Sequence, residues 1–163
     1  MELAPWALTM FRLGGTAILP TQAAHINADD LLPNRHLSLW PYSRLADARL
    51  HLEDEFIAVK AMHEMPPFKI AAFDHQGWAA YWLDGILFCK TFAVHPELPY
   101  PDYDCNAEIY CDGHFIELES LGPLSKLGPG NSVSFIETWE LYDSFEQEFL
   151  SERMIKLVRE GVS

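Results

Sequence analysis

The run FIELE at residues 115–119 sets two carboxylates side by side on one face of a predicted β-strand. Because side chains alternate across a strand, Glu117 and Glu119 share one face while Ile116 and Leu118 share the other. Paired acids are costly inside an apolar core. This face therefore either meets water or lines a polar cleft, in which carboxylates can bind hydroxyl groups or move protons.

Two lysines form a second group of candidate residues. Lys69 in PFKI and Lys90 in FCKTF lie within apolar strands, where each is expected to reach water or to face an acid. Glu108 in NAEIY is a candidate partner for either. With Trp40, Trp78 or Trp82 nearby, such a set would suit a sugar, because hydroxyl groups need donors and acceptors and aromatic rings cover the C–H face. A buried ion-pair network that fixes strand register is the alternative.

Turn residues divide the chain into short apolar runs that are typical of β-strands. Asp84–Gly85 predicts a two-residue hairpin, and Gly14–Gly15 predicts a second hairpin turn with positive φ. The predicted strands are Trp6–Phe11, Thr16–Leu19, Leu37–Trp40, Leu50–Leu52, Phe56–Lys60, Phe68–Phe73, Trp78–Leu83, Ile86–Phe92, Asn106–Cys111, His114–Glu119 and Ser132–Leu141. Since no helical pattern separates consecutive strands, we expect an all-β, antiparallel β-sandwich rather than a βαβ fold. Trp139, in the last strand, is expected to be largely buried.

The last segment changes to a helical period. Four apolar residues fall on one helical stripe: Phe145, Phe149, Ile155 and Val158. Acids lie early and bases late in this segment, which complements the helix dipole. We therefore predict a β-sandwich domain over residues 1–142 and a C-terminal α-helix over residues 143–163, packed on the same domain.

Three motifs, an ELE-S-LGPL run, an L-x-PG-x-S turn and an E-x-W-E-L strand, resemble the C-terminal part of galactose-mutarotase-like (aldose epimerase-like) proteins. The likeness is to their uncharacterised bacterial branch, and it covers most of Glu2 to Tyr142. The upstream runs that carry it are ELAPWALTMFRLGGTAILP, LLPNRHLSLWPYSRLADARLHL, PFKIAAFDHQGWAAYWLDGILFCKTF and YPDYDCNAEIY. Members of that family are considerably longer, so the chain resembles a C-terminal half and the resemblance implies half of a supersandwich.

The resemblance also implies a catalytic glutamate. Interconverting the anomers of an aldose requires a base and an acid, usually a carboxylate and a histidine. Glu119 matches the family glutamate in the L-E-[ST] motif and would be the base. His36 in LPNRHLSLW is our candidate for the acid, because it borders a strand dense in polar and aromatic residues. The candidate substrate-binding residues are Glu117, Glu108, Lys69, Lys90, Arg35, Trp40 and Trp78.

Three functions stay open on this basis. The first is a protein that binds a carbohydrate or a similar polar small molecule on a sheet face. The second is an aldose 1-epimerase-like enzyme with Glu119 as general base. The third is a non-catalytic dimeric interaction protein, and a homodimer is expected in any case because a half-fold leaves sheet edges or an apolar face uncovered.

The composition of the chain indicates which classes of binding partner and which cellular compartment to expect. With 163 residues, 49% of them hydrophobic, the chain can bury one sizeable core. The net charge of −13 argues against nucleic acid or an anionic membrane as a partner. Three cysteines without a C-x-x-C pair favour reduced thiols in the cytoplasm over a disulfide framework or a zinc site. Neither a signal peptide nor a membrane span is evident, and no cofactor or metal is expected.

Overall fold

The computed structural model describes residues 1–22 and 31–143, in which the regular elements are almost entirely antiparallel β-strands. The strands are β1 (Glu2–Leu3), β2 (Trp6–Arg12), β3 (Thr16–Pro20), β4 (Leu37–Leu39), β5 (Leu50–Leu52), β6 (Phe56–Lys60), β7 (Phe68–Ala72), β8 (Trp78–Leu83), β9 (Ile86–Phe92), β10 (Ala107–Cys111), β11 (Phe115–Leu121), β12 (Ser125–Lys126) and β13 (Glu137–Tyr142). The helical element of these ranges, α1 (Pro101–Asp104), is a four-residue turn with left-handed angles at Asp102 and Tyr103. The predicted all-β class is confirmed.

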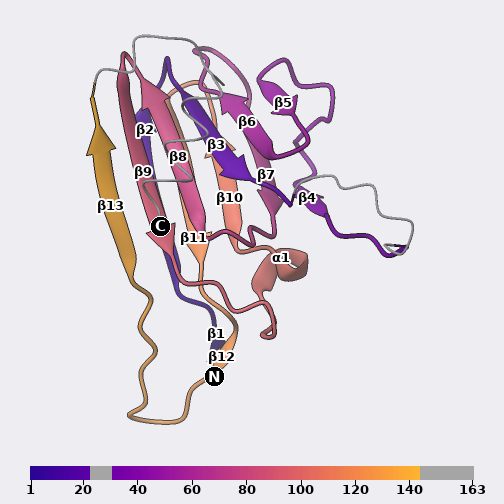
Figure 1. The fold of residues 1–163 in the computed structure, drawn as a ribbon, viewed down its shortest axis with the longest axis vertical. Coiled ribbons are helices and arrows are strands. Elements are labelled where there is room, and N and C mark those ends of the chain that lie inside the picture. The colour runs from indigo at the N-terminus through magenta and orange to yellow at the C-terminus, as the bar shows by residue number, and fades with distance from the viewer. Residues whose placement is uncertain (23–30, 144–163) are drawn as a thin grey trace.

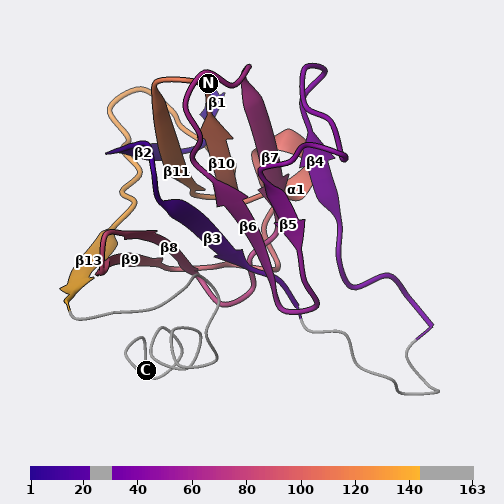
Figure 2. The same cartoon turned by 90° about the horizontal axis from the view of Figure 1, so that it is seen from above.

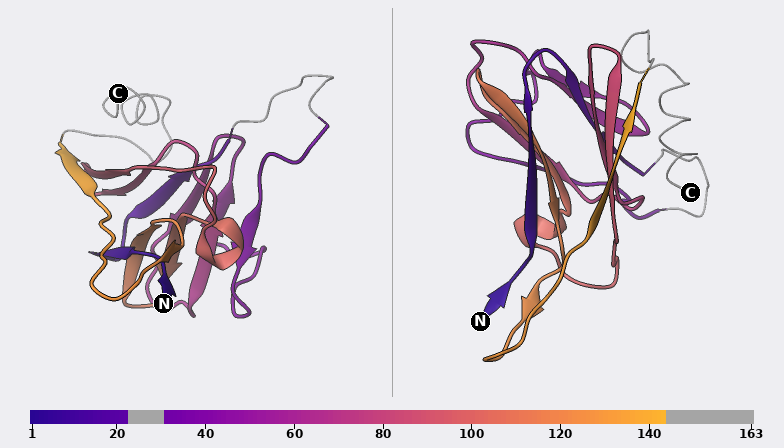
Figure 3. Two further views of the ribbon diagram at one scale, coloured as in Figure 1. Left: turned by 90° about the horizontal axis from the view of Figure 1, so that it is seen from below. Right: turned by 90° about the vertical axis from the view of Figure 1, so that its left-hand side faces the viewer.

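The strands form three sheets (Figure 1). One sheet has the order β2-β11-β10-β7-β4, a second has the order β13-β9-β8-β3-β6-β5, and β1 pairs with β12. The two larger sheets lie face to face, as the view from above shows (Figure 2). The two-stranded sheet extends beyond one end of them (Figure 3).

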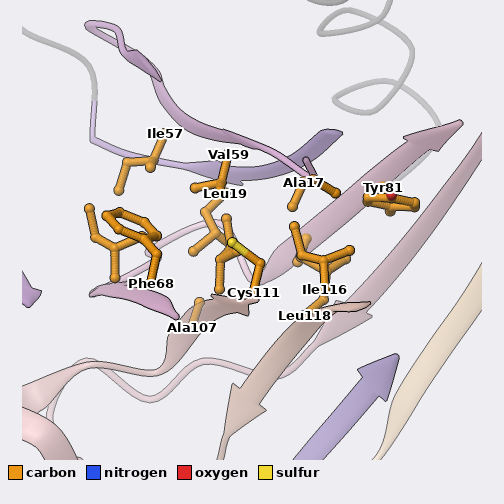
Figure 4. Packing of buried hydrophobic residues seen from close by; sticks show 14 of the residues in the cluster. Ala17, Leu19, Ile57, Val59, Phe68, Tyr81, Ala107, Cys111, Ile116 and Leu118 are labelled. Carbon is orange, nitrogen blue, oxygen red and sulfur yellow. The ribbon is translucent and has the colours of Figure 1, made fainter. Parts of the chain in front are cut away.

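Apolar side chains from both larger sheets meet in one core (Figure 4). Phe68 and Leu118 come from the five-stranded sheet, whereas Leu19, Ile57 and Val59 come from the six-stranded sheet. Because side chains alternate along a strand, every second residue faces this core. Burying one such side chain contributes roughly 1.5–3 kcal/mol, so the face-to-face packing is the main support of the fold.

The six-stranded sheet is apolar on its other face as well. Ile18, Phe56, Trp78 and Leu87 form a second buried cluster with small neighbours from β6, β8 and β9. A strand that is buried on both faces has an almost continuous apolar sequence. This accounts for the uninterrupted run of β3, in which all five residues are buried.

The predicted Asp84–Gly85 hairpin is confirmed. The turn joins β8 to β9, with Leu83 opposite Ile86 in the antiparallel register. Both turn residues have positive φ, 49° at Asp84 and 82° at Gly85. A two-residue turn of this kind matches the right-handed twist of the strands that it joins.

The predicted hairpin at Gly14–Gly15 is wrong. Gly14 has the expected positive φ of 105°, but β2 pairs with β11, whereas β3 pairs with β6 and β8. The turn therefore carries the chain from one sheet to the other. A side chain at Gly15 would place its Cβ 2.2 Å from the Trp82 carbonyl oxygen, so glycine is needed here for close approach to β8.

Trp139 is 60% exposed, so the prediction that it is buried is wrong. It lies on β13, an edge strand with a neighbour on one side only. Its indole ring meets Phe88 edge-on at 5.7 Å, and its indole N–H donates to Glu137 Oε2 at 3.0 Å. Regular pairing in this last strand begins at Glu137 rather than at Ser132.

Three further predictions concern the C-terminal helix, the state of the cysteines and membrane-spanning segments. The predicted C-terminal helix lies outside the described residues, apart from Asp143. Cys89, Cys105 and Cys111 are all buried and free. In the described ranges, no helix has the length and apolar character that crossing a bilayer requires.

Candidate functional site

The outer face of the five-stranded sheet carries one lysine between two glutamates. Lys69 lies on β7, Glu108 on β10 and Glu119 on β11, and β10 lies between the other two strands. Lys69 Nζ lies 2.6 Å from Glu108 Oε2 and 2.9 Å from Glu119 Oε2. All three side chains are buried. We call these three residues the Lys69 cluster.

Strand alternation places the Lys69 cluster on the face away from the core. Ile109 and Leu118 precede or follow the glutamates in sequence and point into the core, so Glu108 and Glu119 point outward. Glu108 lies directly opposite Glu119 in the antiparallel register, and such partners have Cβ atoms about 4.5–5.5 Å apart. Two carboxylates this close repel each other, and the ammonium group of Lys69 offsets the repulsion.

Aromatic rings border the cluster on two sides. Lys69 Nζ lies 4.5 Å from the centroid of the Trp40 ring and 5.3 Å from that of Trp6. The indole N–H of Trp6 donates to Glu119 Oε2 at 2.8 Å. Trp6 is nevertheless 55% exposed, so that one ring both holds the glutamate and presents apolar surface to solvent.

Burial and the neighbouring charges shift the pKa values of the residues in the Lys69 cluster. Desolvation raises the pKa of Glu108 to about 8, against the lowering effect of Lys69. Burial lowers the pKa of Lys69, but its interactions with Glu108 and Glu119 outweigh this and raise it. In the described residues neither Glu108 oxygen is aligned with a hydrogen-bond donor, so the 2.6 Å contact between Lys69 Nζ and Glu108 Oε2 lacks hydrogen-bond geometry. These shifts favour a charged Lys69 and, at neutral pH, the protonated form of Glu108.

Glu117 and Tyr42 extend the polar surface beside the cluster. Glu117 is partly exposed, and its pKa is raised by burial and by the neighbouring charge of Glu119. Tyr42 is exposed, and burial of part of its ring and the nearby glutamates raise its pKa although Lys69 lowers it. Both side chains add hydrogen-bonding groups to the surface near the Lys69 cluster.

Lys90 lies elsewhere, inside the space between the two larger sheets. It is fully buried, and its Nζ donates to Leu118 O and Ser120 Oγ, both at 2.9 Å. Its acid partner is Glu137, at 3.0 Å, rather than Glu108. Ser120 also donates a short hydrogen bond to Glu137. Desolvation lowers the pKa of Lys90. These contacts join β9 to β11 and β13, which is a structural role.

Three other predicted site residues also lie away from the Lys69 cluster. Trp78 is buried in the second apolar cluster, on the far face of the six-stranded sheet. Arg35 and His36 line hollows beside β4, and within the described residues no contact joins His36 to Glu119. The structure thus brings together Lys69, Glu108, Glu119, Glu117 and Trp40, five of the nine predicted residues.

Sequence reasoning missed Trp6 as part of this site. Its strand alternates Trp6, Leu8 and Met10 with smaller or inward residues, and this alternation is a signal that could have placed Trp6 on the outer face. In the described ranges, no group of three or more His, Cys, Asp or Glu residues could hold a metal ion. Comparisons with protein families, with curated proteins and with solved structures gave no match.

Proposed function

We propose that the protein binds a carbohydrate, or a similar polar small molecule, on the outer face of its five-stranded sheet. The observation that carries this proposal is the Lys69 cluster bordered by Trp6 and Trp40, in which the half-exposed Trp6 ring donates a hydrogen bond to the buried carboxylate of Glu119. Sugars are bound by such combinations, because aromatic rings cover C–H groups while carboxylates and ammonium groups take hydroxyls.

The proposed fold type is half of a galactose-mutarotase-like β-sandwich, in line with the sequence motifs. Under this proposal Glu119, the match to the family glutamate, is held by Lys69 and by the indole N–H of Trp6. A ligand would pack on Trp6 and exchange hydrogen bonds with Glu117 and Tyr42. Because the chain is acidic overall, we expect a neutral ligand to be preferred over a sugar phosphate.

The binding proposal is tested by calorimetric titration with common aldoses and their phosphates. Replacing Trp6→Ala removes the ring and should weaken sugar binding by roughly threefold to tenfold, the value of one aromatic contact. Trp139→Ala is the matched control, since Trp139 is exposed to a similar extent but lies on the other sheet. Equal affinities in the two variants would contradict the proposed site.

An aldose 1-epimerase-like activity is the second candidate, favoured by the raised pKa of Glu108, which lies opposite Glu119 in the sheet. In this reaction a base removes the proton of the anomeric hydroxyl while an acid protonates the ring oxygen, so the ring opens and can close on either face. Glu119 would be the base. Glu108 would take the place of the acid, because the predicted acid, His36, lies at the hollows beside β4.

The enzymatic candidate is tested by following anomer exchange by polarimetry. Glu119→Gln keeps the shape of the side chain but removes the base, so exchange should slow by roughly 10²- to 10⁴-fold while sugar binding changes much less. A protein that only binds sugar would give saturable titrations and no acceleration in the wild type. If neither binding nor acceleration occurs across the panel, the cluster serves to fix strand register, and a non-catalytic interaction protein should replace both candidates.

A further inference from the structure

A cavity of about 470 Å³ opens on the side of the molecule where β4 and β5 form the edges of the two larger sheets. Its walls come from both sheets: Leu39 belongs to β4, Ala72 to β7 and Ile57 to β6. Ile57 and Ala72 are core residues, so the cavity reaches the interior. Its volume falls in the range of sites that bind small molecules, about 300–1,000 Å³.

The cavity is lined mainly by apolar side chains that stay accessible to a ligand. Leu37, Leu45 and Leu52 are exposed at 37%, 66% and 48%, and all three line it. Phe73 provides an aromatic wall. Scattered exposed leucines are ordinary, but several around one concave site form an apolar surface that a ligand would remove from water.

The polar part of the lining consists mostly of hydrogen-bond donors. Five polar residues can donate from their side chains: Thr21, Gln22, Asn34, Arg35 and His36. Thr21, Gln22, Asn34 and His36 can also accept hydrogen bonds, and Glu53 adds a carboxylate to the lining. Arg35 donates through Nη1 to the carbonyl oxygen of Asp54 at 3.1 Å, which holds its guanidinium group near the cavity. A carboxylate is the group that an arginine fork and neighbouring amides bind best.

We propose that this cavity binds a small amphipathic carboxylate, with its apolar body between the edges of the two sheets and its carboxylate at Arg35. A second hollow of about 790 Å³ shares Arg35, His36 and Phe73 with the cavity, so a head group larger than a carboxylate also has room. This site is separate from the Lys69 cluster, none of whose residues lines either hollow.

Octanoate is a suitable probe, because it combines one carboxylate with a short alkyl chain. We expect saturable binding of octanoate by calorimetry or by shifts in protein NMR spectra. Arg35→Ala should weaken binding about tenfold or more, since it removes a charge-assisted hydrogen bond. Leu37→Glu should abolish binding by placing a like charge at the apolar wall. Both residues are exposed, so these variants should fold, which circular dichroism checks.

Two controls separate this site from the proposed sugar site. Trp6→Ala should leave octanoate binding unchanged, and octylamine, which carries the opposite charge, should bind at least tenfold more weakly than octanoate. The proposal is overturned if octanoate shows no saturable binding, if it binds both cavity variants as well as the wild type, or if octylamine binds equally well. Loss of sugar binding in Trp6→Ala with octanoate binding retained would support two independent sites.

Discussion

At Lys69 one ammonium group lies beside two buried carboxylates, an imbalance that favours protonation of one carboxylate in the folded chain. Burial raises the pKa of Glu108 to about 8 from its ordinary value of 4.5. Between these values the folded state binds more protons than the unfolded state, so the free energy of unfolding decreases as pH rises through this window. Below pH 4.5 the proton is present in both states and the effect vanishes.

We predict that Glu108→Gln removes this pH dependence, because glutamine mimics the protonated acid. Urea unfolding at pH 5 and pH 8.5 should show the wild type losing stability relative to the variant by more than about 1 kcal/mol, since one pKa unit corresponds to about 1.4 kcal/mol. Burial also raises the pKa of Asp74 to about 7, but Asp74 is present in both proteins and cancels. Parallel stability curves would show that Glu108 is ionised throughout.

The sequence was informative about single residues where a local rule applied. A lysine in an apolar strand must find an acid, and Glu108 is the predicted partner that Lys69 has. The same rule did not identify Glu137 as the partner of Lys90. That pairing depends on β13 lying beside β9. The apolar and polar pattern of a single strand does not determine which strand will lie beside it.

Among the elements, β9 is tied to its surroundings by the buried ammonium group of Lys90. We predict that Lys90→Met lowers the free energy of unfolding by about 3–5 kcal/mol, because it removes the cation that pairs with Glu137 and the donor to the carbonyl of Leu118. Chemical denaturation measures this. Lys60→Met, on an exposed lysine of β6 in the same sheet, should change stability by less than about 1 kcal/mol.

Adding Glu137→Gln to Lys90→Met is the informative double variant. It removes the uncompensated carboxylate, so part of the lost stability should return if an unpaired buried charge causes the loss. No recovery in the double variant, or a loss as small as that of Lys60→Met, would contradict a cross-sheet role for Lys90.

Strand positions could be predicted from the sequence more fully than strand pairing. Turn residues and alternation located most strands to within a residue or two, and Asp84–Gly85 also fixed a pairing because a two-residue turn allows no other. Gly14–Gly15 allowed the same prediction but joins two different sheets. Trp139 was expected to be buried because of its type, yet burial at an edge strand depends on what lies opposite it.

At the scale of the whole described structure, residues 1–22 and 31–143, both larger sheets end on the same side with strands that have one neighbour, β2 and β13 (Figures 1 and 2). Both edges present apolar side chains to solvent: Leu8, Met10, Trp139 and Leu141. Free edges with exposed apolar residues favour pairing with another chain. We therefore expect a homodimer formed through this side.

Sedimentation velocity at micromolar concentration should give a dimer for the wild type. Leu141→Glu should shift the chain to a monomer, because it places a charge on the expected interface. Leu31→Glu is the control, since Leu31 is highly exposed but lies in a loop before β4. A monomeric wild type, or dissociation by both substitutions alike, would contradict this assembly.

The pairing of β2 with β11 also has a consequence for synthesis. Trp6 and its hydrogen-bond partner Glu119 are 113 residues apart in sequence, and translation proceeds at about 5–20 residues per second. For on the order of ten seconds on the ribosome, the apolar residues of β2 have no strand to pair with. Folding dominated by such distant contacts is slow, in the range of milliseconds to seconds. The nascent chain of this protein therefore exposes the apolar side chains of β2 to aggregation until β11 has been synthesised.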